Sequence, residues 1–70
     1  MRIYFLVAAF SRNYSIEYQM QYRSYHLKGT YKIEQEAHAH AARLNQEDTE
    51  MDYRVIEFTV TEERINQDAK

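Results

Sequence analysis

The sequence has no cysteine, no proline and no tryptophan, and Gly29 is its only glycine. Without cysteine, the chain can form neither a disulfide framework nor a zinc site with thiolate ligands. A single glycine excludes the glycine-rich loops that bind phosphate, and the lack of proline and glycine argues against long irregular loops. The chain also has no apolar run long enough to span a bilayer.

The chain has 70 residues and makes one domain at most. A folded chain of this size buries only roughly 60% of the surface that it exposes when unfolded, so a monomer is marginally stable. Because disulfides and thiolate zinc sites are excluded, association is the remaining source of stability. We therefore expect a protein partner, which is either a second copy in a homodimer or a larger obligate partner.

The composition is that of a folded protein, with 44% apolar and 14% aromatic residues. Seven of the aromatic residues are tyrosines, which suit surfaces that bind other molecules and remain hydrated. The formal net charge is −2, so the overall charge does not favour nucleic acid or an anionic membrane.

The charge is unevenly distributed along the chain. Residues 1–32 carry a formal charge of +4, and residues 33–70 carry −6. This asymmetry can orient a partner or a second copy of the chain. An ordinary mixed surface is the simpler interpretation.

The clearest pattern is helical and covers Thr30 to Gln46. Taking about 100° per residue, it places apolar and small side chains on one face. Thr30 is the expected N-cap, and Glu34 and Glu36 lie near the positive end of the helix dipole. Two alanines on the buried face indicate a helix that lies close to a sheet. The residues of this face are Ile33, Ala37, His40, Ala41 and Leu44.

Three segments have the alternation of β-strands. Arg2 to Phe10 is apolar on both faces, which is typical of a central strand covered on both sides. Ile16 to Arg23 alternates apolar and polar residues and is expected to form a hairpin with the first strand. The third predicted strand is Asp52 to Thr61, after a polar loop over 46–50.

The predicted fold is α+β, a three-stranded antiparallel sheet in the order 2-1-3, formed by the element order β-β-α-β with the helix packed on one face. Residues 1–61 make this domain, and residues 62–70 are a polar tail that either adds a short helix or frays. The face under the helix is expected to contain Ile3, Phe5, Val7, Ile16, Tyr18, Met20, Tyr22, Ile56, Phe58 and Val60.

The opposite sheet face has no second helix to cover it in this prediction. An uncovered apolar patch on a small protein usually marks a contact site. We therefore expect this open face to bind a partner protein or to form a dimer. Its predicted contact residues are Tyr4, Leu6, Phe10, Tyr53 and Val55.

The sequence gives little support to metal binding or catalysis. The imidazoles of His38 and His40 point about 200° apart on a helix, so they cannot share one ion, and we expect His40 at the edge of the core and His38 in solvent. No serine lies in a glycine-flanked nucleophile elbow. The carboxylates of the helix lie on a solvent face, and a sheet of three strands with one helix rarely encloses a pocket that shifts their pKa. We expect no catalytic residue, no metal and no cofactor.

Nucleic-acid binding is the alternative function. Tyrosines beside basic residues on a sheet are typical of surfaces that stack bases and contact phosphates. The aromatic signature of RNA-recognition domains is absent, and the acidic second half of the chain repels phosphate. The residues available for this role, or for contacts with an acidic partner, are Arg12, Tyr14, Arg23, Tyr25, Lys28 and Lys32.

In length, economy and composition the sequence is similar to the short orphan reading frames of bacteriophages and mobile elements, some of which block host defence or host enzymes by occlusion. The resemblance covers no motif and indicates no family. It implies a non-enzymatic inhibitor or adaptor, for example a host-defence antagonist in the cytoplasm of a bacterial host. The start of the chain is similar to a signal peptide, but its apolar run of eight residues is short and no small-x-small site follows.

Overall fold

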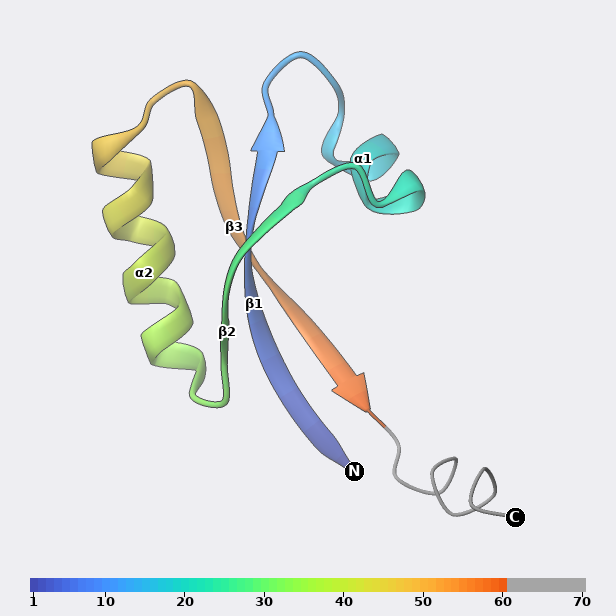
Figure 1. Ribbon diagram of the computed structural model, residues 1–70, viewed down its shortest axis with the longest axis vertical. Helices are drawn as coiled ribbons and strands as arrows, with labels where there is room; N and C mark the ends of the chain where they lie inside the picture. Colours follow the sequence, from blue (N-terminus) through green and yellow to red (C-terminus); the bar gives the residue numbers. More distant parts are fainter. Residues whose placement is uncertain (61–70) are drawn as a thin grey trace.

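The computed structural model describes residues 1–60, which form three strands and two helices (Figure 1). The elements are β1 (Arg2–Ser11), α1 (Ile16–Tyr22), β2 (His26–Tyr31), α2 (Glu34–Glu47) and β3 (Met51–Val60). The strands form one antiparallel sheet in the order β2-β1-β3. This confirms the predicted α+β class and the order 2-1-3. The predicted tail over 62–70 lies outside the described residues.

β1 is the central strand, as its apolar composition predicted. It pairs with β3 along its whole length, from Arg2 opposite Val60 to Ser11 opposite Met51. On its other side it pairs with the shorter β2, and the register shifts between Val7 and Ala8. No helix in the described part of the chain is long and apolar enough to cross a membrane.

The prediction of a strand over Ile16 to Arg23 is wrong, because residues 16–22 form α1. The Ser15 hydroxyl caps this helix by accepting a hydrogen bond from the backbone N–H of Tyr18 at 3.1 Å. A run of seven residues is too short for its periodicity to separate a strand from a helix. The burial of this segment also differs from that of the predicted strand, because the polar residue Gln19 is the only buried residue of α1.

Gln19 holds α1 against the end of β1. Its side-chain oxygen accepts a hydrogen bond from the Ser11 N–H at 2.8 Å, and its amide nitrogen donates to the carbonyl oxygens of Ser11 and Tyr14 at 2.9 and 3.0 Å. The residue is only 2% exposed. A buried amide with several backbone partners fixes the connection between β1 and α1.

The second strand is β2, which covers a segment in which no strand was predicted. Its Val7–Gly29 and Ala8–Leu27 pairs leave Lys28 as the extra residue of a bulge. Thr30 also belongs to β2, so the predicted Thr30 cap is wrong. Ile33 is the N-cap of α2 and provides no side-chain hydrogen bond.

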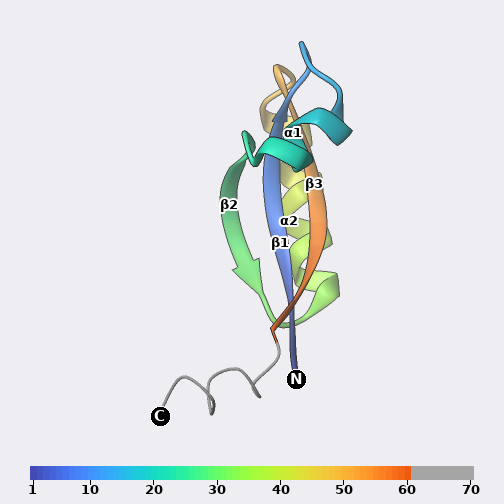
Figure 2. The same cartoon turned by 90° about the vertical axis from the view of Figure 1, so that its right-hand side faces the viewer.

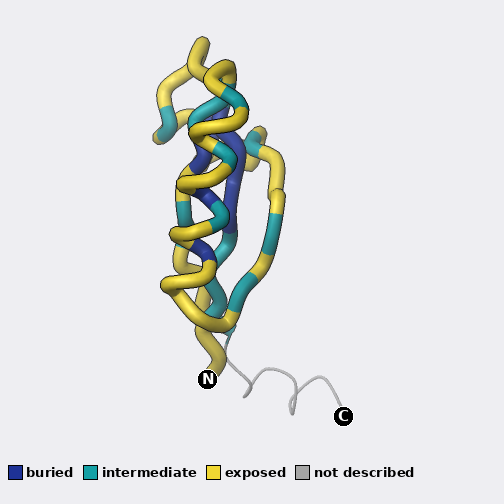
Figure 3. The backbone as a smooth tube through the Cα atoms, turned by 90° about the vertical axis from the view of Figure 1, so that its left-hand side faces the viewer, coloured by how far each residue is buried: buried dark blue, intermediate teal, exposed yellow. Residues whose placement is uncertain are grey.

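The contact of α2 with the sheet confirms the predicted alanine face. Ala37 and Ala41 are buried against Val7, Ala9 and Tyr53, which together form the core cluster. Figure 3, in which α2 lies in front of the sheet, shows these buried positions along β1 and on the inner side of the helix. The partly buried side chains that pack around this cluster are Phe5, Tyr31, Leu44, Met51 and Val55.

His40 occupies the edge of this core, as predicted. Its Nδ1 lies 3.0 Å from the Tyr31 hydroxyl, and the two rings meet edge to face. A Cβ built on Gly29 would stand 3.1 Å from the same Nδ1. The only glycine of the chain therefore lets the helix carry a histidine close to β2. Ile33 was predicted on this face but is 56% exposed at the start of the helix.

The C-terminal turn of α2 is fastened to β3 through Tyr53. The Asn45 amide donates to the Tyr53 carbonyl at 3.0 Å, and its oxygen accepts from the Tyr53 N–H at 2.9 Å. The Tyr53 hydroxyl donates to a carboxylate oxygen of Asp48 at 2.7 Å. The side chain of Tyr53 is therefore held on the face that α2 covers.

The placement of Tyr53 corrects the assignment of faces on β3. Tyr53 and Val55 were predicted on the open face but lie towards α2, whereas Ile56, Phe58 and Val60 lie on the opposite face. The apolar pattern of β3 changes face along the strand because α2 covers only its first half. Alternation alone could not show where the helix stops covering the strand.

The face opposite α2 is partly covered by α1. Figure 2 shows α1 crossing one end of the sheet, while the other end of the three strands lies uncovered. Under the covered end, Phe10 is fully buried and its ring lies 5.3 Å from that of Tyr25. The short helix thus divides this face into a closed end and an open end.

Replacing Gln19 with leucine should destabilise the protein by about 2 kcal/mol, because the Ser11 N–H and the carbonyls of Ser11 and Tyr14 lose their buried partner. Denaturant unfolding measures this change. Gln21→Leu, on the exposed side of the same helix, is the matched control and should leave the midpoint unchanged. Equal effects of the two substitutions would contradict the role given to Gln19.

Stability should fall at both pH extremes through the Asp48–Tyr53 hydrogen bond. The bond from Tyr53 and the backbone N–H of Glu50 lower the pKa of Asp48 from its ordinary 3.8, so this stabilisation is present above that value and is lost as pH falls below it. The same bond and burial raise the pKa of Tyr53 above 10.0, so its contribution is present below pH 10.0 and is lost as pH rises beyond it.

The check is thermal unfolding across pH for the wild-type chain and for Tyr53→Phe, which keeps the ring and removes the hydroxyl. The variant should be less stable at neutral pH and should lose less stability than the wild type both below pH 3.8 and above pH 10.0. Parallel pH profiles for the two proteins would show that this bond does not contribute to the pH dependence.

Candidate interaction surface

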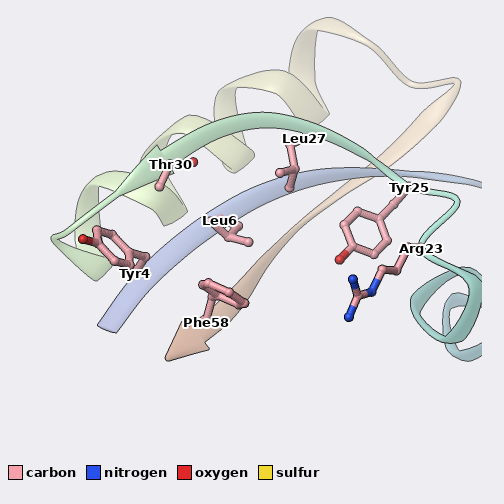
Figure 4. A pocket seen from close by; sticks show the side chains of 7 residues that line it. All are labelled: Tyr4, Leu6, Arg23, Tyr25, Leu27, Thr30 and Phe58. Atoms are coloured by element: carbon pink, nitrogen blue, oxygen red, sulfur yellow. The ribbon is translucent and has the colours of Figure 1, made fainter. Parts of the chain in front are cut away.

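The open end of the sheet face forms a shallow hollow of about 730 Å³ (Figure 4). All three strands and the segment after α1 contribute to it. Leu27 and Phe58 are exposed by 56% and 51%, so large apolar side chains face solvent here. The residues that line the hollow are Tyr4, Leu6, Arg23, Tyr25, Leu27, Thr30 and Phe58.

The strand register explains why these side chains meet. Tyr4 pairs with Phe58 of β3, and Leu6 pairs with Thr30 of β2. Paired residues of adjacent strands point to the same side of a sheet. The bulge at Lys28 shifts the pairing of β2 with β1 by one residue and sets Leu27 opposite Ala8. Without the extra residue, the strand beyond the bulge would present its other set of side chains to this face.

Arg23 borders the hollow from the end of α1. It adopts the left-handed conformation, with φ 53° and ψ 42°, and is the only described non-glycine residue with positive φ. Its backbone N–H closes the helix by bonding to the Met20 carbonyl. Figure 4 shows its guanidinium beside the Tyr25 ring. Within residues 1–60 this guanidinium has no hydrogen bond or ion pair.

The structure keeps two of the five predicted open-face residues in the hollow. Tyr4 and Leu6 line it, whereas Phe10 is buried under Tyr25. Tyr53 and Val55 lie on the face that α2 covers. Tyr53 and Val55 therefore lack the exposure that the predicted partner contacts require.

Sequence reasoning did not assign Leu27, Phe58 and Thr30 to this face. Phe58 was placed under the helix, and Leu27 lay in no predicted helix or strand. The sequence signal for Phe58 was the alternating run Ile56, Phe58 and Val60. In the pairing of β3 with β1, this run lies on the same face as Tyr4 and Leu6.

The residues proposed for nucleic-acid contacts do not form one surface. Arg12 follows the end of β1, whereas Lys32 follows the end of β2, next to the residue that pairs with Phe5. The β1 residues next to these two positions, Phe5 and Ser11, are six residues apart, which is about 20 Å of extended chain. Arg23 and Tyr25 belong to the hollow. Lys28 lies in the bulge of β2.

A row of exposed tyrosines lies along α1 and the residues just before it, which the predicted strand did not indicate. Tyr14, Tyr18 and Tyr22 are all exposed, and their ring centroids are 5.8 and 4.8 Å apart in succession. Their spacing of four residues is the sequence signal for one helix face. Tyr14 and Tyr18 stack and Tyr18 and Tyr22 meet at a tilt, so neighbouring rings already cover part of one another.

The two histidines of α2 lie apart from each other. His38 lies 3.4 Å from Glu34 on the exposed side of α2 and away from His40, as the helical spacing predicted. Residues 1–60 contain no group of three or more histidine, aspartate or glutamate side chains that could hold a metal ion. Among residues 1–60, the candidate site is the apolar hollow bordered by Arg23.

No family model, curated protein sequence or solved structure matches this chain. The candidate site is therefore defined by its geometry.

Replacing Arg23 with glycine should raise the free energy of unfolding by roughly 0.5–1 kcal/mol, because glycine adopts the left-handed conformation without the steric cost of a Cβ. Denaturant unfolding measures the change. Arg23→Asn, which also tolerates this conformation, should lie between the wild type and the glycine variant. A loss of stability in both variants would show that the arginine side chain stabilises the fold.

Proposed function

We propose that this chain is a non-enzymatic protein-interaction module that binds a larger protein through the hollow on its open sheet face. The observation that carries the proposal is the group of exposed apolar and aromatic side chains at one place, with Leu27 and Phe58 more than half exposed. A small protein that exposes such a patch gains by covering it.

The composition of the hollow suits a protein interface. Tyrosine, phenylalanine and arginine are enriched at the centre of interfaces, where rigid rings fill pockets and arginine makes directed hydrogen bonds. The hollow has two tyrosines, one phenylalanine and one arginine, of which Tyr4 and Phe58 lie on strands. Since strands hold these two rings, binding loses little of their conformational entropy.

The hollow also indicates the chemistry of the partner segment. Its floor accepts apolar side chains between Leu6, Leu27 and Phe58. At its border, the guanidinium of Arg23, which has no partner within residues 1–60, can bind a carboxylate with two parallel hydrogen bonds. The proposed partner therefore presents an apolar side chain with an aspartate, a glutamate or a chain-terminal carboxylate beside it.

A role as inhibitor or adaptor follows from this mode of binding. A protein that occupies a surface needs no reacting group of its own, and the hollow contains no pair of carboxylates, no histidine and no serine. Such a protein acts by occlusion or by bridging. This agrees with the resemblance to short reading frames of phages and mobile elements, and with a site of action in the bacterial cytoplasm.

The test is affinity capture from a bacterial lysate with the wild-type chain, Leu27→Glu and Ile33→Glu. Leu27 and Ile33 are both 56% exposed, but only Leu27 lines the hollow, so the two substitutions add the same charge at matched exposure. The proposal expects one stoichiometric protein that binds the wild type and Ile33→Glu, loses at least tenfold in affinity for Leu27→Glu and survives nuclease treatment.

The same experiment separates the alternatives. Equal capture by all three chains would show that the hollow does not bind the partner. Capture that disappears with nuclease would move the function to nucleic-acid binding, and its salt dependence would then measure the phosphate contacts. Arg23→Asn should weaken capture of a partner that presents a carboxylate, and the variant keeps the backbone conformation at this position.

A further inference from the structure

The outer edge of β3 is a second surface with unused binding groups. β3 is an edge strand of ten residues that pairs only with β1. Edge strands present unpaired backbone N–H and C=O groups, and proteins commonly block them with proline, lysine or a bulge. β3 contains neither proline nor lysine, and its pairing with β1 has no register shift.

The Asn45 side chain shows which backbone groups of β3 face outward. Its amide bonds to both the N–H and the C=O of Tyr53, as a neighbouring strand would. The backbone groups of alternate residues point to the same side of a strand. The outward groups beyond Tyr53 are therefore those of Val55, Glu57 and Thr59, and no described residue bonds to them.

Asn45 also determines where this edge is available. It occupies the outward groups of Tyr53 and so closes the end of the strand beside α2. The available edge begins at Val55, which still packs beside α2, and continues through Glu57 and Thr59, which are exposed. Its open-face side chains are Ile56, Phe58 and Val60, which are all apolar.

We infer that a second copy of this chain pairs with this edge, β3 against β3 and antiparallel, about a twofold axis at Phe58. The axis at Phe58 sets Phe58 against its copy and Ile56 against Val60 of the copy on one face. On the other face it sets Glu57 against Thr59 of the copy. The two sheets then form one continuous six-stranded sheet.

Two registers with the axis nearer the start of β3 are less favourable for physical reasons. An axis at Glu57 sets two carboxylates directly opposite each other, and like charges at opposed positions destabilise a sheet. An axis at Ile56 sets Thr59 against Tyr53 of the copy, whose backbone groups are already bonded to Asn45. The axis at Phe58 avoids both the opposed carboxylates and the blocked Tyr53, and it pairs apolar side chains with apolar side chains. Because the edge is complementary to itself in this register, the proposed occupant is a second copy.

This inference is independent of the partner proposed for the hollow, since the two surfaces share only Phe58. It also supplies the stability that a short chain without disulfides needs. In the dimer the two hollows lie on the same face of one sheet, on either side of the paired Phe58 residues. The dimer therefore offers two equivalent binding surfaces.

The absence of cysteine makes the register directly measurable, because any disulfide reports an introduced thiol. Residues that face each other in a non-hydrogen-bonded antiparallel pair have Cα atoms about 4.5 Å apart, within the range of a disulfide. Phe58→Cys should therefore cross-link with its copy under mild oxidation. Ile56→Cys should not, because four residues of strand separate the two thiols by about 13 Å.

Glu57→Pro tests the edge by another route. The Glu57 N–H points outward, so proline there removes a bond between copies and leaves the β1–β3 ladder intact. The wild type and Glu57→Gln should have the mass of a dimer in analytical ultracentrifugation, whereas Glu57→Pro should be a folded monomer by circular dichroism. Leu27→Glu should remain a dimer, which separates this edge from the hollow.

Three outcomes would overturn the inference. A wild-type chain that stays monomeric at millimolar concentration would exclude pairing, and a Glu57→Pro chain that stays dimeric would place the contact elsewhere. Cross-linking of Ile56→Cys or Glu57→Cys faster than that of Phe58→Cys would reject the axis at Phe58.

Discussion

The close contact between the alanine face of α2 and the centre of the sheet is the constraint on which the other features depend. Ala37 and Ala41 let the helix lie directly on β1 and β3, where Val7, Ala9 and Tyr53 complete the core. Alanine adds little area to bury, so the contact gains its stability from close approach. Because the helix is shorter than the strands, it leaves half of β3 uncovered, and both proposed surfaces are on or beside that half.

The sequence predicts the arrangement of the fold better than the identity of its parts. The helix predicted over Thr30 to Gln46 is α2 (Glu34–Glu47), and the central position of β1 follows from its apolar composition. The predicted order 2-1-3 is confirmed, but its second strand is β2 and not the predicted segment from Ile16 to Arg23. The segment over residues 16–22 alternates like a strand, yet a Ser15 cap and a buried Gln19 make it a helix. Its capping bonds involve backbone groups that no pattern of apolar residues reports.

The sequence predicted only part of the hollow on the open sheet face. Tyr4 and Leu6 were found because β1 is apolar on both faces and one face lacked a cover. Leu27 was missed because β2 is polar and bulged, and Phe58 was missed because the extent of helical cover is not a property of β3 itself. Arg23 reaches the hollow through a left-handed turn that only the folded backbone shows.

The position of β1 in the sheet has a consequence for synthesis. β1 is the first of the described elements to be synthesised, yet it is the central strand, and one of its two neighbours is β3, the last described element. A nascent chain that has not reached residue 51 holds an apolar central strand with one side bare, and long-range pairing of this kind folds slowly. Premature termination before β3 therefore yields a fragment that chaperones and proteases recognise.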